Sequence, residues 1–220
     1  MESEYRQFVK AAICSLNQHP LDFSNNLANI IKSIEQAKKQ KCRLRVGPEL
    51  EVSGYMCEDH FNEYDTVIHS WQVIEEVLAS GLTDGILCDI GMPVMHKNVL
   101  YNCRVLLLDS KVLGLRPKMN LADGGNYFES RWFSAWKYNH VEEFDLPVGI
   151  QKLTGATSVP IGHIVIKCLD VEIGFEICEE AWISNNPMIQ QSLDGVEIFV
   201  NSSASHAEEG KLKRKIQMVC

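Results

Sequence analysis

The stretch "VLYNCRVLLLDSKVLGLRPK", residues 99–118, decides the fold class. Two apolar runs flank Asp109-Ser110, a pair typical of the tight turn between antiparallel strands. The stretch therefore predicts a β-hairpin whose second strand ends at Arg116-Pro117 and delivers Lys118 directly after it. An antiparallel hairpin in the middle of the chain favours a mixed sheet over a parallel barrel, in which a helix would follow every strand.

Strand-like and helix-like segments alternate on the N-terminal side of this hairpin. Apolar side chains at helical spacing predict helices over residues 24–40 and 61–80, and Ser24 is the expected N-cap of the first. Apolar runs predict strands at residues 8–16, 42–47, 85–95 and 196–201, and one strand in each half of 163–178. The first of these strands is expected to be buried. Residues 121–136 indicate a structured loop, and short helices are expected at 186–195 and after residue 206. The whole pattern predicts one layered, mixed α/β domain over residues 1–220.

Composition excludes several functional classes. The net charge of -8 argues against nucleic-acid binding, and the cluster Lys211 to Lys215 indicates a solvated helix face. The sequence contains neither an apolar run of about 18 residues nor a signal-peptide layout, so we expect a cytoplasmic protein without a membrane partner. The eight cysteines are expected as free thiols, with Cys14 and Cys168 among those inside apolar strands. CxxC and HExxH patterns are absent from the sequence, so no metal is expected.

Three ionisable residues follow predicted strands directly. Glu49 follows "RLRVGP", Lys118 follows "VLGLRP", and Cys178 follows "EIGFEI". Ligand sites of open α/β sheets gather beyond the carboxyl ends of the strands, so a carboxylate, an ammonium group and a thiol converge there if these strands are neighbours. Such a cluster would supply a cysteine nucleophile with a base and a cation.

The residues alone leave a structural interpretation of each of these side chains open. A cysteine at the end of an apolar strand is more often a core thiol, and a lysine after a strand is usually solvated. The acids Glu176, Glu179 and Glu180 around the cysteine should raise its pKa and oppose thiolate formation. Glu51 also competes with Glu49 for the role of the base.

A resemblance to a known family adds to this interpretation. It is carried, in chain order, by "GPELEVSGY" (47–55), "DIGMPVMHKNVLYNCR" (89–104), "RPKMNLADGGNYFESRWF" (116–133), "GFEICEEAW" (174–182) and "LDGVEIFVNSSASH" (193–206). The chain resembles the nitrilase, or carbon–nitrogen hydrolase, superfamily, and within it the glutaminase domains of eukaryotic glutamine-dependent NAD(+) synthetases. The resemblance implies a nitrilase-like α-β-β-α sandwich of two mixed sheets, incomplete here at its C-terminal end.

The resemblance also implies residue roles and a reaction. Glu49 would be the general base, Lys118 an electrostatic stabiliser and Cys178 the nucleophile that forms a thioester with glutamine. Substrate-binding positions implied by the same likeness are Tyr55, Tyr127, Glu179, Ser205 and Lys211. Ammonia released from glutamine would then amidate nicotinic acid adenine dinucleotide to give NAD.

Cofactors and partners follow from the same resemblance. The glutaminase half is expected to need no cofactor, whereas ATP and Mg²⁺ belong to a synthetase domain whose serine- and glycine-rich ATP loop does not occur in this sequence. The expected partners are glutamine as substrate, a synthetase domain or full-length subunits, and further copies of the chain as a homo-oligomer.

Three other functions stay open at this point. The chain could be a stand-alone amidase of the nitrilase family that acts on another small amide. It could be an amidotransferase that uses Cys178 with His206 and Glu208, although that class places its cysteine between glycines, unlike Ile177 and Glu179 here. It could also be a truncated, non-catalytic isoform that binds full-length subunits.

Overall fold

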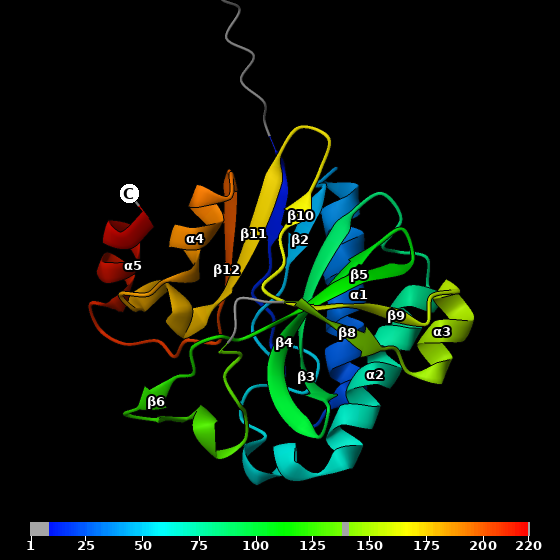
Figure 1. Ribbon diagram of the computed structural model, residues 1–220, viewed down its shortest axis with the longest axis horizontal. Coiled ribbons are helices and arrows are strands. Elements are labelled where there is room, and N and C mark those ends of the chain that lie inside the picture. The colour runs from blue at the N-terminus through cyan, green and yellow to red at the C-terminus, as the bar shows by residue number, and fades with distance from the viewer. Residues whose placement is uncertain (1–8, 138–140, 220) are drawn as a thin grey trace, which may run out of the picture.

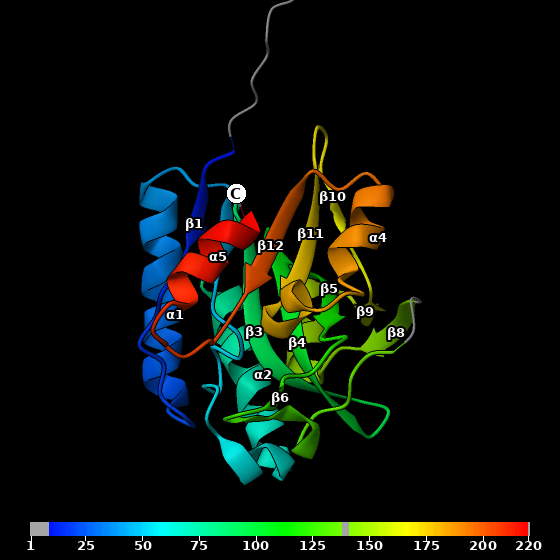
Figure 2. The ribbon, with the colours of Figure 1, turned by 90° about the vertical axis from the view of Figure 1, so that its left-hand side faces the viewer.

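The computed structural model describes residues 9–137 and 141–219, and its layers run α-β-β-α (Figure 1). The larger sheet has the strand order β1-β2-β3-β4-β5-β9-β8, and the smaller sheet has the order β10-β11-β12. Helices α1, α2 and α3 cover the outer face of the larger sheet, and α4 and α5 lie on the side of the smaller one. In the turned view, α5 and α4 lie on either side of the neighbouring strands β12 and β11 (Figure 2). The two mixed sheets confirm the predicted sandwich.

The strands and helices have the following bounds. The larger sheet comprises β1 Ala11–Ile13, β2 Leu44–Val46, β3 Leu87–His96, β4 Val99–Leu108, β5 Lys111–Pro117, β8 Val141–Asp145 and β9 Ser158–Gly162. The smaller sheet comprises β10 Ile166–Lys167, β11 Glu172–Ile177 and β12 Ile198–Ser202, and a separate ribbon pairs β6 Asp123–Gly124 with β7 Tyr127–Phe128. The α-helices are α1 Phe23–Lys39, α2 Tyr64–Ala79, α3 Val148–Thr154, α4 Pro187–Leu193 and α5 Lys211–Val219. Short 3-10 helices span Glu58–Asn62, Glu129–Arg131 and Cys178–Trp182.

The central hairpin forms where the sequence predicts it. Asp109 and Ser110 join β4 to β5 with φ angles of 49° and 55°, the left-handed pair that matches the twist of antiparallel strands. Lys118 therefore leaves β5 immediately after its last residue, Pro117.

Two separate apolar layers hold the sheets in place. Ile34 of α1 and Ile74 of α2 pack with the helix-facing side of the larger sheet and are fully buried. Between the sheets, Val46 of β2 packs with Phe175 of β11 and Val200 of β12. Each such side chain contributes about 1.5–3 kcal/mol by leaving water. This inter-sheet layer fixes the ends of β2 and β11, where two of the predicted site residues lie.

Two predictions about the N-terminal region are wrong. A buried strand was expected over residues 8–16, of which residue 8 lies outside the described residues. The strand is limited to β1, and Ile13 is 76% exposed. The reason is that β1 lies at the edge of the sheet, where β2 is its one paired neighbour among the described residues. Helix α1 begins one residue earlier than expected, and its N-cap is Asp22, whose carboxylate accepts a hydrogen bond from the backbone N–H of Asn25.

No helix or strand was expected over residues 141–162, where the structure has β8, α3 and β9. Strand β8 reads "VEEFD" and buries only Phe144, so it lacks the apolar run on which the strand predictions depended. The expectation for Cys168 was also wrong, since this residue is exposed, whereas Cys14 is half-buried.

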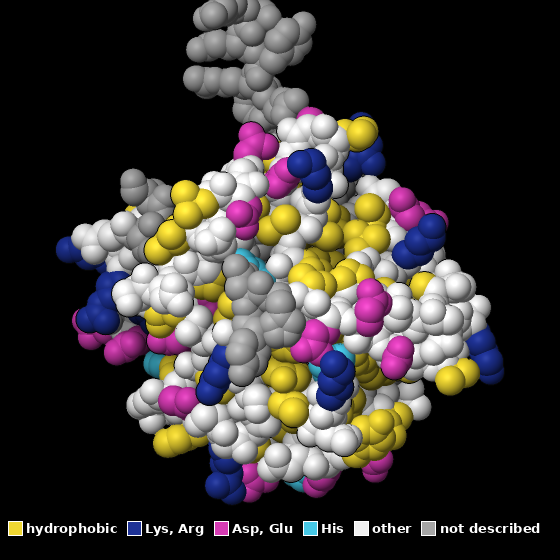
Figure 3. All heavy atoms as spheres, viewed as in Figure 1, with side chains coloured by type: hydrophobic (Ala, Val, Ile, Leu, Met, Phe, Trp, Pro, Cys, Tyr) yellow, Lys and Arg dark blue, Asp and Glu magenta, His cyan; other side chains and the backbone are white. Residues whose placement is uncertain are grey.

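Charged side chains lie on the surface, as expected for the basic cluster Lys211 to Lys215. On the face in Figure 3, acidic and basic side chains are interspersed, and lysine and arginine gather at the edge formed by α5. Within the described part of the chain, no helix is long and apolar enough to cross a membrane.

Candidate active site

Glu49 and Lys118 meet at the carboxyl ends of β2 and β5. The Lys118 Nζ lies 2.6 Å from Glu49 Oε1, and both side chains are fully buried. Asn102 of β4 donates a second hydrogen bond from Nδ2 to the same carboxylate oxygen, at 2.8 Å. A buried ion pair of this kind is stable only with such additional donors, because both ions give up their hydration.

Cys178 completes the cluster from the smaller sheet. It follows the last residue of β11, is 5% exposed, and begins a 3-10 helix with a φ of 43°. A positive φ is a strained conformation for a residue with a β-carbon, and such strain recurs where a strand turns sharply to present a nucleophile. The Sγ atom accepts a hydrogen bond from Ser203 Oγ at 3.2 Å and lies 3.8 Å from Ser205 Oγ, both in the loop after β12.

The charges of Glu49 and Lys118 act directly on the Cys178 sulfur. Burial raises the pKa of the thiol and the Glu49 carboxylate raises it further, whereas Lys118, Ser203 and Ser205 lower it. The net direction is upward, so the thiol is protonated at neutral pH and needs a base before it can attack. Glu49 also accepts a hydrogen bond from the backbone N–H of Ala204, so its carboxylate contacts the loop that contacts the sulfur.

The three acids beside Cys178 are not the main cause of its raised pKa, which corrects the expectation from the sequence. Glu176 accepts a hydrogen bond from the backbone N–H of Met188, and Glu180 pairs with Arg116. Glu179 is half-buried and, within residues 9–137 and 141–219, joins none of the contacts of the cluster. The alternative base, Glu51, is bound to Arg45 at 2.6 Å.

Glu129 is a member of the cluster that the sequence analysis missed. One of its carboxylate oxygens accepts hydrogen bonds from Lys118 Nζ at 2.8 Å and from the Tyr55 hydroxyl at 2.5 Å. The other oxygen accepts one from the backbone N–H of Ala122 at 2.9 Å. Burial and the nearby Glu49 raise the pKa of Glu129, and the two carboxylates together raise the pKa of Lys118. Lys118 therefore remains a cation between two acids.

A second buried ion pair connects the segments that carry the lysine and the cysteine. Arg116 Nη1 lies 2.6 Å from Glu180, and both side chains are fully buried. Glu180 also accepts hydrogen bonds from the backbone N–H groups of Ile177 and Met119. These two residues are the immediate neighbours of Cys178 and Lys118, so one carboxylate fixes the spacing between both functional groups.

The predicted substrate-binding residues lie around this cluster to different extents. The rings of Tyr55 and Tyr127 meet edge to face at 6.2 Å between centroids. The Lys211 Nζ lies 6.0 Å from the centroid of the Tyr127 ring, and Ser205 lies beside the sulfur as described. Both tyrosines line an open pocket of about 560 Å³, whose lining does not itself include Glu49, Lys118 or Cys178. Tyr55 connects this pocket to the cluster through its hydrogen bond to Glu129. Tyr55, Tyr127, Ser205 and Lys211 are thus connected to the site, whereas Glu179 is only adjacent in sequence.

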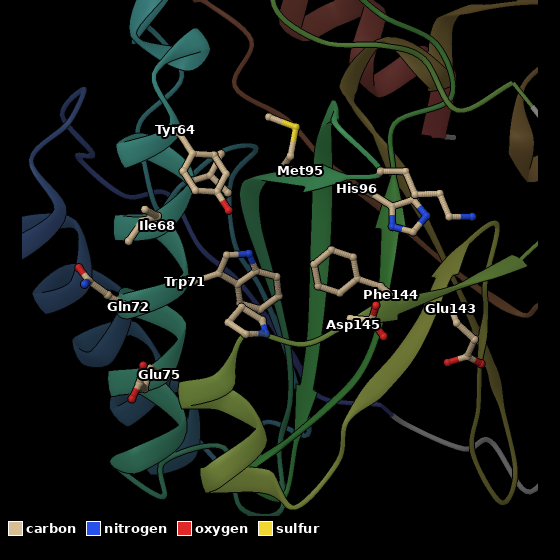
Figure 4. Close-up of a pocket in the computed structure, with 13 residues that line it drawn as sticks. Tyr64, Ile68, Trp71, Gln72, Glu75, Met95, His96, Glu143, Phe144 and Asp145 are labelled. Carbon is tan, nitrogen blue, oxygen red and sulfur yellow. The ribbon is translucent and has the colours of Figure 1, made fainter.

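The pocket in Figure 4 is separate from this cluster. Its volume is about 620 Å³, and it lies between α2, the β3–β4 hairpin and β8. Its lining includes Trp71, His96 and Phe144 but none of the residues that surround Cys178. The chemistry of the titratable groups, rather than the size of a cavity, therefore locates the candidate site.

Comparison with known proteins identifies the family of the chain. The family model of the carbon–nitrogen hydrolases matches residues 10–219, and the chain belongs to this family. It is 51% identical to the human glutamine-dependent NAD(+) synthetase and 50% identical to that of Saccharomyces cerevisiae, in each case over 96% of this chain and 30% of the relative. The chain thus spans about 30% of the length of the curated relatives it matches.

Solved structures extend the likeness to three dimensions. A glutamine-dependent NAD(+) synthetase from Cytophaga hutchinsonii superposes with a TM-score of 0.82 at 30% identity, over 96% of this chain and 33% of that one. An amidase from Nesterenkonia sp. superposes with a TM-score of 0.68 over 93% of this chain and 70% of that one. Its sequence identity of 16% makes this second likeness one of fold alone.

The two charged neighbours of Cys178 are expected to move its titration in opposite directions. Glu49 raises the pKa of the thiol and Lys118 lowers it, so Glu49→Gln should lower this pKa and Lys118→Met should raise it. Ultraviolet absorbance of the thiolate measures the pKa, as the difference between each variant and the same variant that also carries Cys178→Ser. Displacement of the pKa in the same direction by both substitutions would contradict the prediction.

Proposed function

We propose that this chain is a glutaminase that hydrolyses the side-chain carboxamide of glutamine through a thioester on Cys178. The observation that carries the proposal is the convergence of Cys178 with the buried pair formed by Lys118 and Glu49. A thiol, a carboxylate and an ammonium group are the nucleophile, the base and the cation that hydrolysis of an amide requires. Membership of the carbon–nitrogen hydrolase family supports the same reaction class.

The acylation half of the reaction begins with the protonated thiol. Glu49 accepts the proton of Cys178 while the sulfur attacks the carboxamide carbon of glutamine. The carbonyl oxygen becomes an oxyanion, which the Lys118 ammonium and a backbone N–H near Cys178 stabilise; one such donor is typically worth about 3–4 kcal/mol. The carbon–nitrogen bond then breaks, Glu49 returns the proton to the departing nitrogen, and ammonia leaves behind a glutamyl thioester.

Deacylation reuses the same groups. Glu49 accepts a proton from water, the resulting hydroxide attacks the thioester carbon, and the carbon–sulfur bond breaks. The proton then returns to the Cys178 sulfur, and glutamate is released. Lys118 remains protonated throughout, because Glu129 still pairs with it while Glu49 carries the proton.

Glutamine as the substrate and NAD synthesis as the purpose are proposed from the relatives. The human and Saccharomyces cerevisiae relatives, which are 51% and 50% identical to this chain, are both glutamine-dependent NAD(+) synthetases. This chain matches about 30% of their length. We assign the ATP-dependent amidation that consumes the ammonia, with its ATP and Mg²⁺, to the part of such an enzyme that these 220 residues do not match. The synthetase part and full-length subunits are accordingly the proposed partners of this chain, and a homo-oligomer is the proposed assembly.

The proposal is tested by ammonia release from the 220-residue chain. We expect glutamine to be hydrolysed faster than asparagine, acetamide or propionamide, and acid quenching during turnover should trap a glutamyl adduct on the peptide that contains Cys178. Cys178→Ala should abolish both signals, whereas Cys57→Ala, a matched change of a buried thiol outside the cluster, should preserve them. Faster turnover of another amide would instead favour a stand-alone amidase, and an adduct on a different residue would reject the mechanism.

A further inference from the structure

A contact between Tyr127 and His206 connects two segments that flank the candidate site. The Tyr127 hydroxyl lies 2.5 Å from His206 Nδ1, and the two rings pack at 5.3 Å between centroids. The backbone N–H of His206 also approaches the same hydroxyl, at 3.4 Å. Tyr127 comes from β7, and His206 comes from the loop after β12, which is 79 positions further along the chain.

Tyr127 receives little support from its own ribbon. Strands β6 and β7 pair through only two residues each, and a β-carbon placed on Gly124 or Gly125 would meet no atom within 4 Å. A two-stranded ribbon of this size is marginal without packing partners. The position of the Tyr127 ring therefore depends on its edge-to-face contact with Tyr55, on the Lys211 ammonium over its face and on its bond to His206.

A chain of contacts links His206 to the centre of the site. Tyr127 packs on Tyr55, the Tyr55 hydroxyl donates to Glu129, and Glu129 accepts from Lys118. In the other direction, His206 lies in the same loop as Ser203 and Ser205, which contact the Cys178 sulfur. Together these contacts hold the two tyrosines that line the pocket at a fixed distance from the loop that carries Ser203 and Ser205.

The geometry also separates a positioning role of His206 from an acid–base role. The ring uses Nδ1 for Tyr127, whereas its Nε2 is 3.8 Å from Glu208, beyond hydrogen-bond distance, and both of these side chains are exposed. Among the described residues, the hydrogen bonds of the Cys178 sulfur go to Ser203 and Ser205 and not to this imidazole. Within the described residues, the side-chain hydrogen bonds of His206 therefore do not reach the reacting atoms directly.

We propose that His206 is a positioning residue that holds Tyr127 in place as a wall of the glutamine pocket, and so sets the KM for glutamine. The inference rests on the proposed function, because it assigns Tyr127 to the binding of that substrate. Losing the bond should weaken glutamine binding and leave the chemical step intact, because Glu49, Lys118 and Cys178 keep their contacts.

Two amide substitutions test which nitrogen of the imidazole matters. His206→Asn places a polar atom at the position of Nδ1, whereas His206→Gln places one near Nε2. We expect His206→Ala and His206→Gln to raise the KM for glutamine about fivefold to tenfold, the size of one lost hydrogen bond, with kcat within about twofold. His206→Asn should stay within about threefold of the unmodified chain. Tyr127→Phe should match His206→Ala, and the double variant should be no worse than either single variant.

Three kinetic results would overturn the inference. If His206→Gln keeps the KM of the unmodified chain and His206→Asn does not, the role would belong to the contact of Nε2 with Glu208. A fall of kcat at constant KM in His206→Ala would make His206 part of the chemistry. If both His206→Ala and His206→Gln have the KM and kcat of the unmodified chain, His206 has no role in positioning Tyr127 for glutamine binding.

A readout that needs no turnover separates this inference from the proposed function. Limited proteolysis followed by mass spectrometry reports how well residues 121–128 are held. Cleavage there should be faster in His206→Ala and His206→Gln than in His206→Asn. If the unmodified chain does not hydrolyse glutamine but cleavage still follows this order, the proposed function fails while the contact stands. If cleavage is equal in all variants, the positioning role fails.

Discussion

Replacing Glu49 with glutamine is expected to lower kcat/KM for glutamine by about a hundredfold to ten-thousandfold, the range that a positioned general base contributes. The thiol of Cys178 has a raised pKa and cannot supply the thiolate at neutral pH without a base. The substitution preserves the size of the side chain and an oxygen that can accept from Lys118 and Asn102, so it removes the base without removing these contacts.

Steady-state ammonia release measures this effect, and far-ultraviolet circular dichroism checks that the variant is folded. Glu35→Gln is the matched control, because this residue of α1 is exposed and lies outside the cluster. Its activity should equal that of the unmodified chain. A Glu49→Gln protein that retains more than about a tenth of the activity would show that another group takes the proton, and Glu129 would then be the next candidate.

Replacing Glu180 with glutamine is expected to cost about 3–5 kcal/mol in the free energy of unfolding, the usual penalty for breaking a buried ion pair. The Arg116 guanidinium is fully buried, and its Nε and Nη2 already lack hydrogen-bond partners among the described residues. Glu180 is therefore the main compensation for this buried charge. Activity should fall even at temperatures where the variant is folded, because Glu180 fixes the segments that carry Cys178 and Lys118.

Urea denaturation with fluorescence detection measures the loss of stability, and ammonia release at low temperature measures the loss of activity. The exposed pair between Asp59 and Arg131 provides the control, since Asp59→Asn breaks an ion pair with the same shortest distance of 2.6 Å in solvent. Its effect on stability should be much smaller, because water screens and replaces an exposed pair. Equal effects of the two substitutions would mean that burial does not determine the importance of the Arg116–Glu180 pair.

The sequence was sufficient to predict the central hairpin. It also showed that Glu49, Lys118 and Cys178 each follow an apolar strand, but their meeting depended on these strands being neighbours, which the family resemblance implied and the residues alone did not. The family resemblance supplied the layer order that these patterns alone left open. Glu129 was missed because an acidic residue in a glycine-rich loop has the same local pattern whether it is solvated or buried. Its burial depends on Lys118 and Tyr55, which reach it only after folding.

Glu180 was misjudged for a related reason. As part of "EICEE" it was expected to act on the neighbouring thiol, but its carboxylate turns toward Arg116 on another strand. Side-chain direction at the end of a strand is set by the turn that follows, here the positive φ of Cys178. Strand β8 was missed because its single buried residue, Phe144, gives no periodic pattern.

The protonated resting state of Cys178 has a consequence for how the protein tolerates oxidants. Peroxide and disulfides react with thiolates, and the rate follows the fraction of sulfur that is ionised. A sulfur that is 5% exposed and whose pKa lies above that of a free cysteine presents little thiolate to such reagents. The same burial that makes a neighbouring base necessary therefore slows the formation of sulfenic acid on this cysteine between catalytic cycles.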